Sequence, residues 1–316
     1  MNTAAKLSAY GAALALVVVG AYATGTAVGP LPTESVVSGA HGGTSGAEGA
    51  GHGDGHSGTV AGTAIDQPGG LASSRDGYTL TPTDPTLTAA TSGNFSFRLT
   101  SPGGAVVTDF DVEHDKRMHL IVVRRDTTGF QHIHPEMAPD GTWSVPLTLP
   151  AAGSYRAFAD FTPTGGQGLT LGIDLSVPGP FEPVAHQPSR TAVVDGYQVK
   201  LNGDLVAGQA SPLTLLVSRD GQPVTDLQPY LSAYGHLVAL RVGDLAYLHV
   251  HPDGAPGDGR TAAGPEIEFV AEVPSTGSYR LFLDFSHGGV VRTAEFTVPT
   301  GPAAAGGGAP HGGGHR

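Results

Sequence analysis

The chain contains two copies of one pattern, each about 100 residues long, and this repeat limits the folds open to it. The copies open at Asp76-Gly77-Tyr78 and Asp195-Gly196-Tyr197. Three further blocks recur in the same order: Val-Thr-Asp at 107–109 and 224–226, Gly-Ser-Tyr-Arg at 153–156 and 277–280, and Phe-x-Asp-Phe at 158–161 and 282–285. Two copies are fewer than the three that a solenoid needs, so we predict a tandem pair of domains.

Short strand signals, separated by Gly, Pro, Asn and Asp, fill each copy, and no long helical period follows residue 30. This spacing is typical of a β-sandwich of immunoglobulin-like size. We therefore predict an all-β fold of two tandem immunoglobulin-like β-sandwich domains, at residues 76–178 and 193–299. A Pro-rich linker at 179–192 would join them.

The N-terminal segment, residues 1–29, predicts export. Lys6 precedes an uncharged apolar run from Leu7 to about Val28, close to the roughly 20 residues that span a bilayer. Ala21-Tyr22-Ala23 also offers a signal-peptide cleavage site. The segment is thus a transmembrane anchor or a signal peptide, and the remaining chain is expected on the exported face of the cell membrane or secreted.

Two segments outside the repeats, residues 30–75 and 300–316, are rich in Gly and contain His. We predict a disordered Gly/Ser/His linker and a disordered Gly/His tail. They would either collect metal weakly or serve only as soluble linkers.

The composition excludes several classes of function. The formal net charge of −12 argues against a nucleic-acid partner and would attract cations. The chain has no cysteine, which excludes disulfides and thiolate sites. Any metal ligands must therefore be His, Asp or Glu, Met or backbone oxygen.

Each copy carries three histidines at the same spacing, a gap of thirteen residues and then two, closed by a proline. Histidine is the commonest metal ligand among side chains. The candidate metal ligands are His119, His132 and His134 in the first copy, and His236, His249 and His251 in the second.

In the second copy, Gly243-Asp244 between two apolar runs predicts a two-residue hairpin loop. Pairing outward from Val242 and Leu245 places His236 directly opposite His251. His249 shares their face of the sheet, because side chains two apart on a strand point the same way.

In the first copy, a loop at Asp126-Thr127, or a four-residue loop with the same register, places His119 opposite His134 with His132 diagonal. We therefore expect two patches of converging imidazoles, one per sandwich. Buried nitrogens without partners cost roughly 1–3 kcal/mol each, and a bound ion would remove that cost. Hydrogen bonds to carbonyls, or a wet sheet edge, are the alternatives.

Two aspartates, Asp160 and Asp284 of the Phe-x-Asp-Phe blocks, are candidate additional metal ligands. Their alternative roles are an Asx-type turn or a salt bridge to Arg156 or Arg280. Further candidates to complete the sites are Met118 and His287, whereas His114 ranks low because the second copy has Leu231 at its position.

Imidazole suits several transition metals, and the Irving–Williams order favours copper, with zinc as the alternative. We predict a non-enzymatic metal-binding protein that buffers or delivers copper outside the cytoplasm. Its partners would be the metal ion, the membrane through the N-terminal helix, and an envelope metal transporter or metalloprotein. The alternatives are a structural or interaction module of the cell envelope, or a metal-dependent enzyme, because three histidines with an open position also form catalytic zinc sites.

Three blocks, Met118-His-Leu-Ile-Val-Val-Arg-Arg, Phe130-Gln-His-Ile-His-Pro and Tyr155-Arg-Ala-Phe-Ala-Asp-Phe, resemble those of actinobacterial exported or membrane-anchored proteins of the YtkA-like domain family. The resemblance covers about residues 76–298. It implies β-sandwich domains and an association with copper handling.

Overall fold

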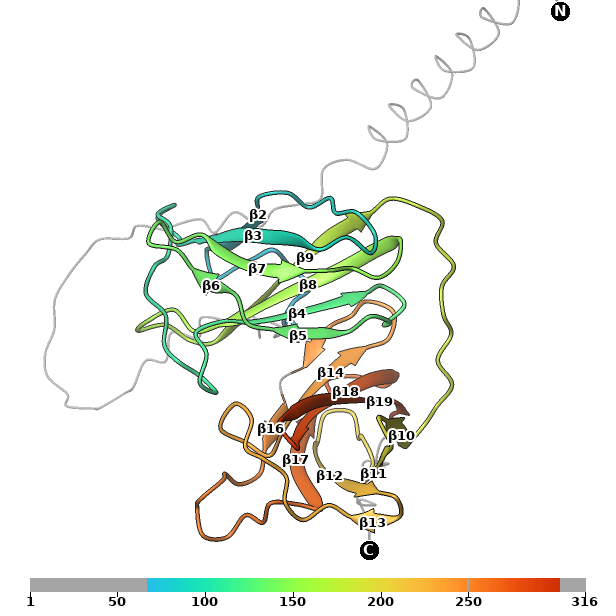
Figure 1. Cartoon of the computed structure of the whole chain (residues 1–316). Helices are drawn as coiled ribbons and strands as arrows, with labels where there is room; N and C mark the ends of the chain where they lie inside the picture. Colours follow the sequence, from blue (N-terminus) through green and yellow to red (C-terminus); the bar gives the residue numbers. More distant parts are fainter. Residues whose placement is uncertain (1–66, 249, 302–316) are drawn as a thin grey trace, which may run out of the picture. The chain divides into compact units, whose positions relative to one another are not determined.

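The computed structural model describes residues 67–248 and 250–301, and they form an all-β structure of strands β1 to β19 (Figure 1). The predicted N-terminal segment 1–29, most of the 30–75 linker and nearly all of the 300–316 tail lie outside these residues. No helix within the described ranges is long and apolar enough to cross a membrane.

The first repeat consists of two antiparallel sheets. The five-stranded sheet runs in the order β1 (Ser74–Arg75), β2 (Tyr78–Pro82), β3 (Gly93–Thr100), β7 (Trp143–Leu147) and β6 (Glu136–Met137). The four-stranded sheet runs in the order β5 (Gln131–Ile133), β4 (His119–Arg124), β8 (Gly153–Phe161) and β9 (Leu169–Val177).

The second repeat has the same strand order. One sheet contains β10 (Thr191–Val194), β11 (Tyr197–Asn202), β12 (Ala210–Arg219), β17 (Glu266–Glu272) and β16 (Val250–Pro252), with β13 (Gln222–Pro223) paired to β12. The other contains β15 (Tyr247–Leu248), β14 (Gly235–Arg241), β18 (Ser278–His287) and β19 (Val290–Pro299). The predicted fold class, two tandem β-sandwiches, is confirmed.

Each sandwich has its own core between its two sheets. On β3, Phe95, Phe97 and Leu99 alternate with more exposed residues and point into the first core. On β11, Tyr197 and Val199 do the same in the second core. Alternation follows from the period of two along a strand, so one face of each outer sheet is apolar.

The four-stranded sheets break this alternation because both of their faces are covered. Every residue of β4 is buried. Leu120 and Val122 pack in the first core, whereas Ile121 and Val123 belong to a third apolar cluster that joins the two repeats. Figure 1 shows β4 and β5 next to β14 and β18.

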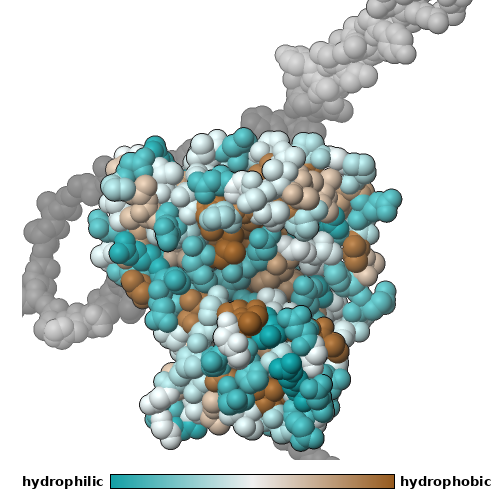
Figure 2. Space-filling model, in the orientation of Figure 1, coloured by the Kyte–Doolittle hydropathy of each residue, from teal (hydrophilic) through white to brown (hydrophobic). Residues whose placement is uncertain are grey.

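The third cluster is built around a pair of stacked rings. Phe130, beside β5, lies parallel to Phe282 of β18, with ring centroids 4.0 Å apart and an interplanar angle of 5°. Full burial of such a side chain contributes roughly 1.5–3 kcal/mol. In Figure 2, hydrophobic residues on the visible face form small groups among hydrophilic ones, in agreement with the scattered exposed valines such as Val112 and Val193.

A Gly-Gly pair, Gly69-Gly70, runs between the repeats. The Tyr247 N–H donates to the Gly69 carbonyl (3.0 Å), and the Gly70 N–H donates to the Thr170 carbonyl (2.8 Å). Gly70 has a φ of +73°, and a Cβ there would lie 2.3 Å from the Phe158 ring. Glycine is therefore required, both for the left-handed backbone and for the close approach.

Candidate metal centre

The first hairpin has the predicted register. Leu120 pairs with Ile133 and Ile121 with His132, as expected from pairing outward from the loop. The loop is wider than Asp126-Thr127 alone, because the Arg124 N–H donates to the Thr128 carbonyl (2.9 Å). The predicted register of this hairpin is confirmed, although the ladder ends at Leu120 and Ile133 and does not extend to the predicted pair of His119 with His134.

The second hairpin keeps its predicted register only near the loop. Ala239 pairs with Leu248 and Leu240 with Tyr247, as expected. The predicted two-residue loop is wrong, since the Arg241 N–H donates to the Ala246 carbonyl (3.0 Å) around a four-residue loop.

Beyond Leu248 the chain leaves β14 for the other sheet, where His251 pairs with Val270 of β17. The predicted pairing of His236 with His251 is therefore wrong. The sequence suggests that one strand continues along β14, but β16 instead forms an edge of the six-stranded sheet, as β6 forms an edge of the five-stranded sheet in the first repeat. His249 and the side chain of His251 lie outside the described parts of the chain.

Three imidazoles of the first repeat, His119, His132 and His134, form what we call the histidine triad. One ring nitrogen from each lies within 4.8 Å of the other two. His119 Nδ1 is 3.0 Å from His132 Nε2. Two Zn–N bonds of about 2.0–2.1 Å in a tetrahedron place their nitrogens about 3.3 Å apart, so this spacing suits two ligands of one ion.

The outward nitrogens of two triad rings are held by acceptors. His119 Nε2 lies 3.1 Å from the Glu113 carbonyl oxygen, and His132 Nδ1 lies 2.8 Å from Oδ2 of Asp284. Because carbonyls and carboxylates accept hydrogen bonds, each of these nitrogens carries the proton and donates it. The inward nitrogens of His119 and His132 then face each other with lone pairs, which need a shared proton or a cation between them.

His134 supplies the third ligand nitrogen of the triad. Its Nε2 atom is buried and has no hydrogen-bond partner among the described residues. Buried polar atoms nearly always have a partner, so an unpaired one in a cluster of imidazoles indicates a missing ligand. An ion bound by the three inward nitrogens would satisfy all of them together.

Burial keeps two of the triad histidines, His119 and His134, neutral at neutral pH. It lowers the pKa of His119 to about 4, partly offset by the bond to the Glu113 carbonyl. It lowers the pKa of His134 to about 3, and the nearby His132 and His119 lower that pKa further. Neutral imidazole is the form that binds metal, so His119 and His134 are ready to bind at neutral pH.

The second repeat contributes His236 to the same region. Its ring centroid lies 6.3 Å from that of His132 and 5.0 Å from that of His114. Its Nε2 lies 2.9 Å from the Leu231 carbonyl oxygen, and burial lowers its pKa to about 4. The expectation of two separate patches is wrong for the described histidines, because the outer faces of β4 and β14 pack against each other and bring His236 close to the histidines of the first repeat.

Two tight turns hold the carbonyls that bind His119 and His236. In the first, Glu113 and Lys116 exchange backbone hydrogen bonds around His114 (φ 47°) and Asp115 (φ 63°). The second repeat has the same turn at 230–233, with Leu231 at φ 53°. Positive φ at a leucine is strained, and such strain concentrates at functional sites. The first of these turns places His114, a weak candidate from the sequence, at the edge of the cluster, with its ring centroid 6.2 Å from that of His119.

The two candidate aspartates lie opposite the histidines of their own repeats, Asp160 opposite His119 and Asp284 opposite His236. Neither carboxylate is one of the three converging ligands. Asp160 Oδ1 accepts from Thr170 (2.7 Å), and its charge, together with a bond to the Tyr247 phenol, adds to the burial that raises the pKa of Tyr247. Asp284 instead binds His132 of the other repeat.

The remaining candidates lie elsewhere. Met118 packs in the first core, on the opposite face from His119. His287 bonds to Tyr197 and Asp226. The alternative salt bridges of the two aspartates are not formed, because Arg156 pairs with Asp174 and Arg280 with Glu295.

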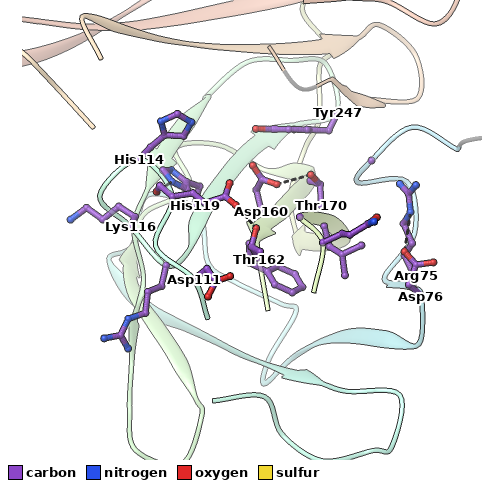
Figure 3. A pocket seen from close by; sticks show the side chains of 17 residues that line it. Arg75, Asp76, Asp111, His114, Lys116, His119, Asp160, Thr162, Thr170 and Tyr247 are labelled. Carbon is purple, nitrogen blue, oxygen red and sulfur yellow. Dashed lines mark hydrogen bonds and ion pairs between the residues drawn. The ribbon is translucent and has the colours of Figure 1, made fainter. Parts of the chain in front are cut away.

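A solvent-facing pocket of 410 Å³ reaches the edge of the triad (Figure 3). His114 and His119 lie together on one side of it, and Asp160 lies beneath the ring of Tyr247. A second cavity of 40 Å³ is lined by His132 and His236 as well as His114 and His119. The two hollows are adjacent, since His114, His119, Asp160 and Tyr247 line both of them.

Fold and site together define a tandem β-sandwich protein with a partly buried histidine triad at the contact between its repeats. The sequence pattern of the family described as "Domain of unknown function (DUF8832)" matches residues 72–179 and 192–301. The chain therefore belongs to this family.

Solved structures with similar folds overlap poorly. They include the Escherichia coli adhesin FdeC, with 14% identity over 72% of this chain and 65% of that one, at a TM-score of 0.25. A Salmonella alpha-2-macroglobulin matches with 14% identity over 74% of this chain and 15% of that one, at 0.26. The Ig1-2 module of a Drosophila receptor tyrosine phosphatase matches with 8% identity over 71% and 99%, at 0.19. The chain thus spans less than two thirds of the length of the first two proteins. Structural similarity at these TM-scores carries no argument about function. A search of curated proteins gave no match.

Proposed function

We propose that this protein binds a transition-metal ion through His119, His132 and His134. The observation that carries the proposal is the set of converging nitrogens: His119 Nδ1 and His132 Nε2 lie 3.0 Å apart, and the buried Nε2 of His134 has no hydrogen-bond partner among the described residues. The outer nitrogens of His119 and His132 already have acceptors, which is the usual support of metal-bound histidine.

Copper is the preferred ion and zinc the alternative. The converging ligands are all imidazole nitrogens, which suit both metals, and copper binds such ligands more tightly in the Irving–Williams order. Zinc prefers four ligands, so the three histidines would leave one of its coordination positions open.

The role we propose is buffering or delivery of the ion outside the cytoplasm, without catalysis. The support for export is the apolar N-terminal segment, and the net charge of −12 would favour cation capture. The resemblance to YtkA-like proteins points the same way and stays a prediction. A membrane transporter or another metalloprotein would exchange the ion.

The test is metal titration of the full chain, purified without an affinity tag, with Cu⁺ in competition with a chelator and with Zn²⁺ by calorimetry. The double variant His132→Ala with His134→Ala should lose one tight equivalent. His186→Ala is the matched control, because His186 lies in the 179–192 linker and bonds only to the Asp126 carbonyl among the described residues.

The proposal fails if the wild-type chain takes up no stoichiometric metal at low micromolar concentration. It also fails if the double variant binds as many equivalents as the wild type. Hydrolase and oxidase assays on the loaded protein should give no activity above free metal, and a turnover that depends on the triad would favour the enzyme alternative.

A further inference from the structure

We infer that Asp284 of the second repeat is a positioning residue for the triad of the first, so that metal binding and docking of the two repeats are coupled. The inference rests on the proposed function. It goes further by making the centre a joint property of both repeats.

A hydrogen bond within the second repeat orients the carboxylate of Asp284 toward His132. Oδ1 of Asp284 accepts a hydrogen bond from the Thr293 hydroxyl (2.6 Å), and Thr293 lies directly opposite on β19. The other oxygen, Oδ2, accepts from His132 Nδ1 at 2.8 Å. The two side chains are only 4% and 5% exposed, so water hardly competes for this bond.

The bond determines which nitrogen of His132 can bind an ion. With the proton fixed on Nδ1, Nε2 keeps its lone pair toward His119 and the centre of the triad. Without Asp284, the proton of a neutral His132 could move to Nε2 and block the ligand position. Carboxylates that accept from metal-bound histidines act in this way and also make the imidazole more basic.

The apolar contact between Phe130 and Phe282 brings His132 and Asp284 together. Phe130 precedes His132 by two residues, and Phe282 precedes Asp284 by two. Residues two apart share a face of a strand, so the stacked rings and the hydrogen-bonded pair lie side by side in the same contact. Asp284 and His132 are 152 positions apart in the sequence, so only the contact between the repeats brings them together. Loss of this contact would therefore break their hydrogen bond.

Coupling of this kind is reciprocal. If docking of the second repeat raises metal affinity, the bound ion must strengthen docking by the same factor. The ion would thus stabilise the contact between the repeats, although the three triad ligands all come from the first.

The test compares the full-length wild type with Asp284→Asn and Asp220→Asn. Asp220 is the matched control, since its side chain is 90% exposed and lies in the same repeat. We expect Asp284→Asn to weaken the triad's binding of Zn²⁺ and Cu⁺ by about 10–100-fold, and Asp220→Asn to leave it unchanged.

Two readouts separate positioning from simple loss of structure. Nitrogen-15 NMR of the zinc-loaded wild type should show His132 protonated at Nδ1, and this signal should change in Asp284→Asn. Zinc should also slow amide exchange in β14 and β18 of the wild type, but much less in the variant. Fluorescence of Trp143, the single tryptophan, reports whether the first repeat is folded.

If Asp284→Asn does not fold, Thr293→Val replaces it in the test, because it keeps the charge of Asp284 and removes only the hydrogen bond to Oδ1. We then expect a smaller loss of metal affinity. The inference is overturned if the folded variant binds metal as tightly as the wild type, or if zinc protects the first repeat alone. Failure of the wild type to bind metal would instead overturn the proposed function.

Discussion

Mild acid should destabilise the metal-free protein through its buried histidines. Burial lowers the pKa of His119 and His236 from 6.5 to about 4 in the folded chain. Between these values the unfolded chain takes up protons that the folded chain does not. Stability should therefore be complete above pH 6.5 and fall as the pH drops toward 4.

The size of the effect follows from the shifts. At pH 5.0 each histidine is 1.5 units below its unfolded pKa, and one unit corresponds to 1.36 kcal/mol, so each costs about 2 kcal/mol. His119 and His236 are 8% and 9% exposed, so solvent screens them little, and together they cost about 4 kcal/mol. The lowered pKa of His134 acts in the same direction. This is a large part of the 5–15 kcal/mol of a typical domain.

The assay is urea unfolding in the presence of a chelator at pH 7.5 and 5.0, followed by circular dichroism and by the fluorescence of Trp143. His119→Gln and His236→Gln should each remove about 2 kcal/mol of the difference between the two pH values, because glutamine does not titrate. An equal free energy of unfolding at both pH values in the wild type would refute the reasoning. So would a variant that keeps the full difference.

Two further predictions concern the contact between the repeats. Phe282→Ala should lower the free energy of unfolding by about 3–5 kcal/mol, because it removes the ring that stacks on Phe130. Phe282→Leu should lower it by less. Urea unfolding measures both variants, and equal losses would contradict a specific stack. Gly70→Ala should cost more than about 1 kcal/mol, because its φ is +73° and its Cβ would collide with Phe158. Gly104→Ala has a similar φ of +80° but open space around it, so a thermal melt of both separates collision from backbone strain, and equal losses would remove the collision.

The sequence by itself determined the repeat, the all-β class and the register of the first hairpin. These depend on contacts between residues close in the chain: a turn, a period of two, and paired strands on either side of the loop. The same local reasoning failed at His251, because the choice between continuing along β14 and joining β17 depends on a strand about twenty residues further along.

Only the tertiary structure decided that the histidines of the two repeats meet and that Asp284 serves His132 rather than a ligand position of its own. No spacing in the chain encodes the docking of two outer sheet faces, since that depends on the fit of side chains such as Phe130 and Phe282. One signal was present: the runs at 120–123 and 237–240 are apolar without alternation, which indicates a sheet covered on both faces. The sequence could thus predict that something covers these sheets, but the shape of the packed side chains determined that each repeat covers the other.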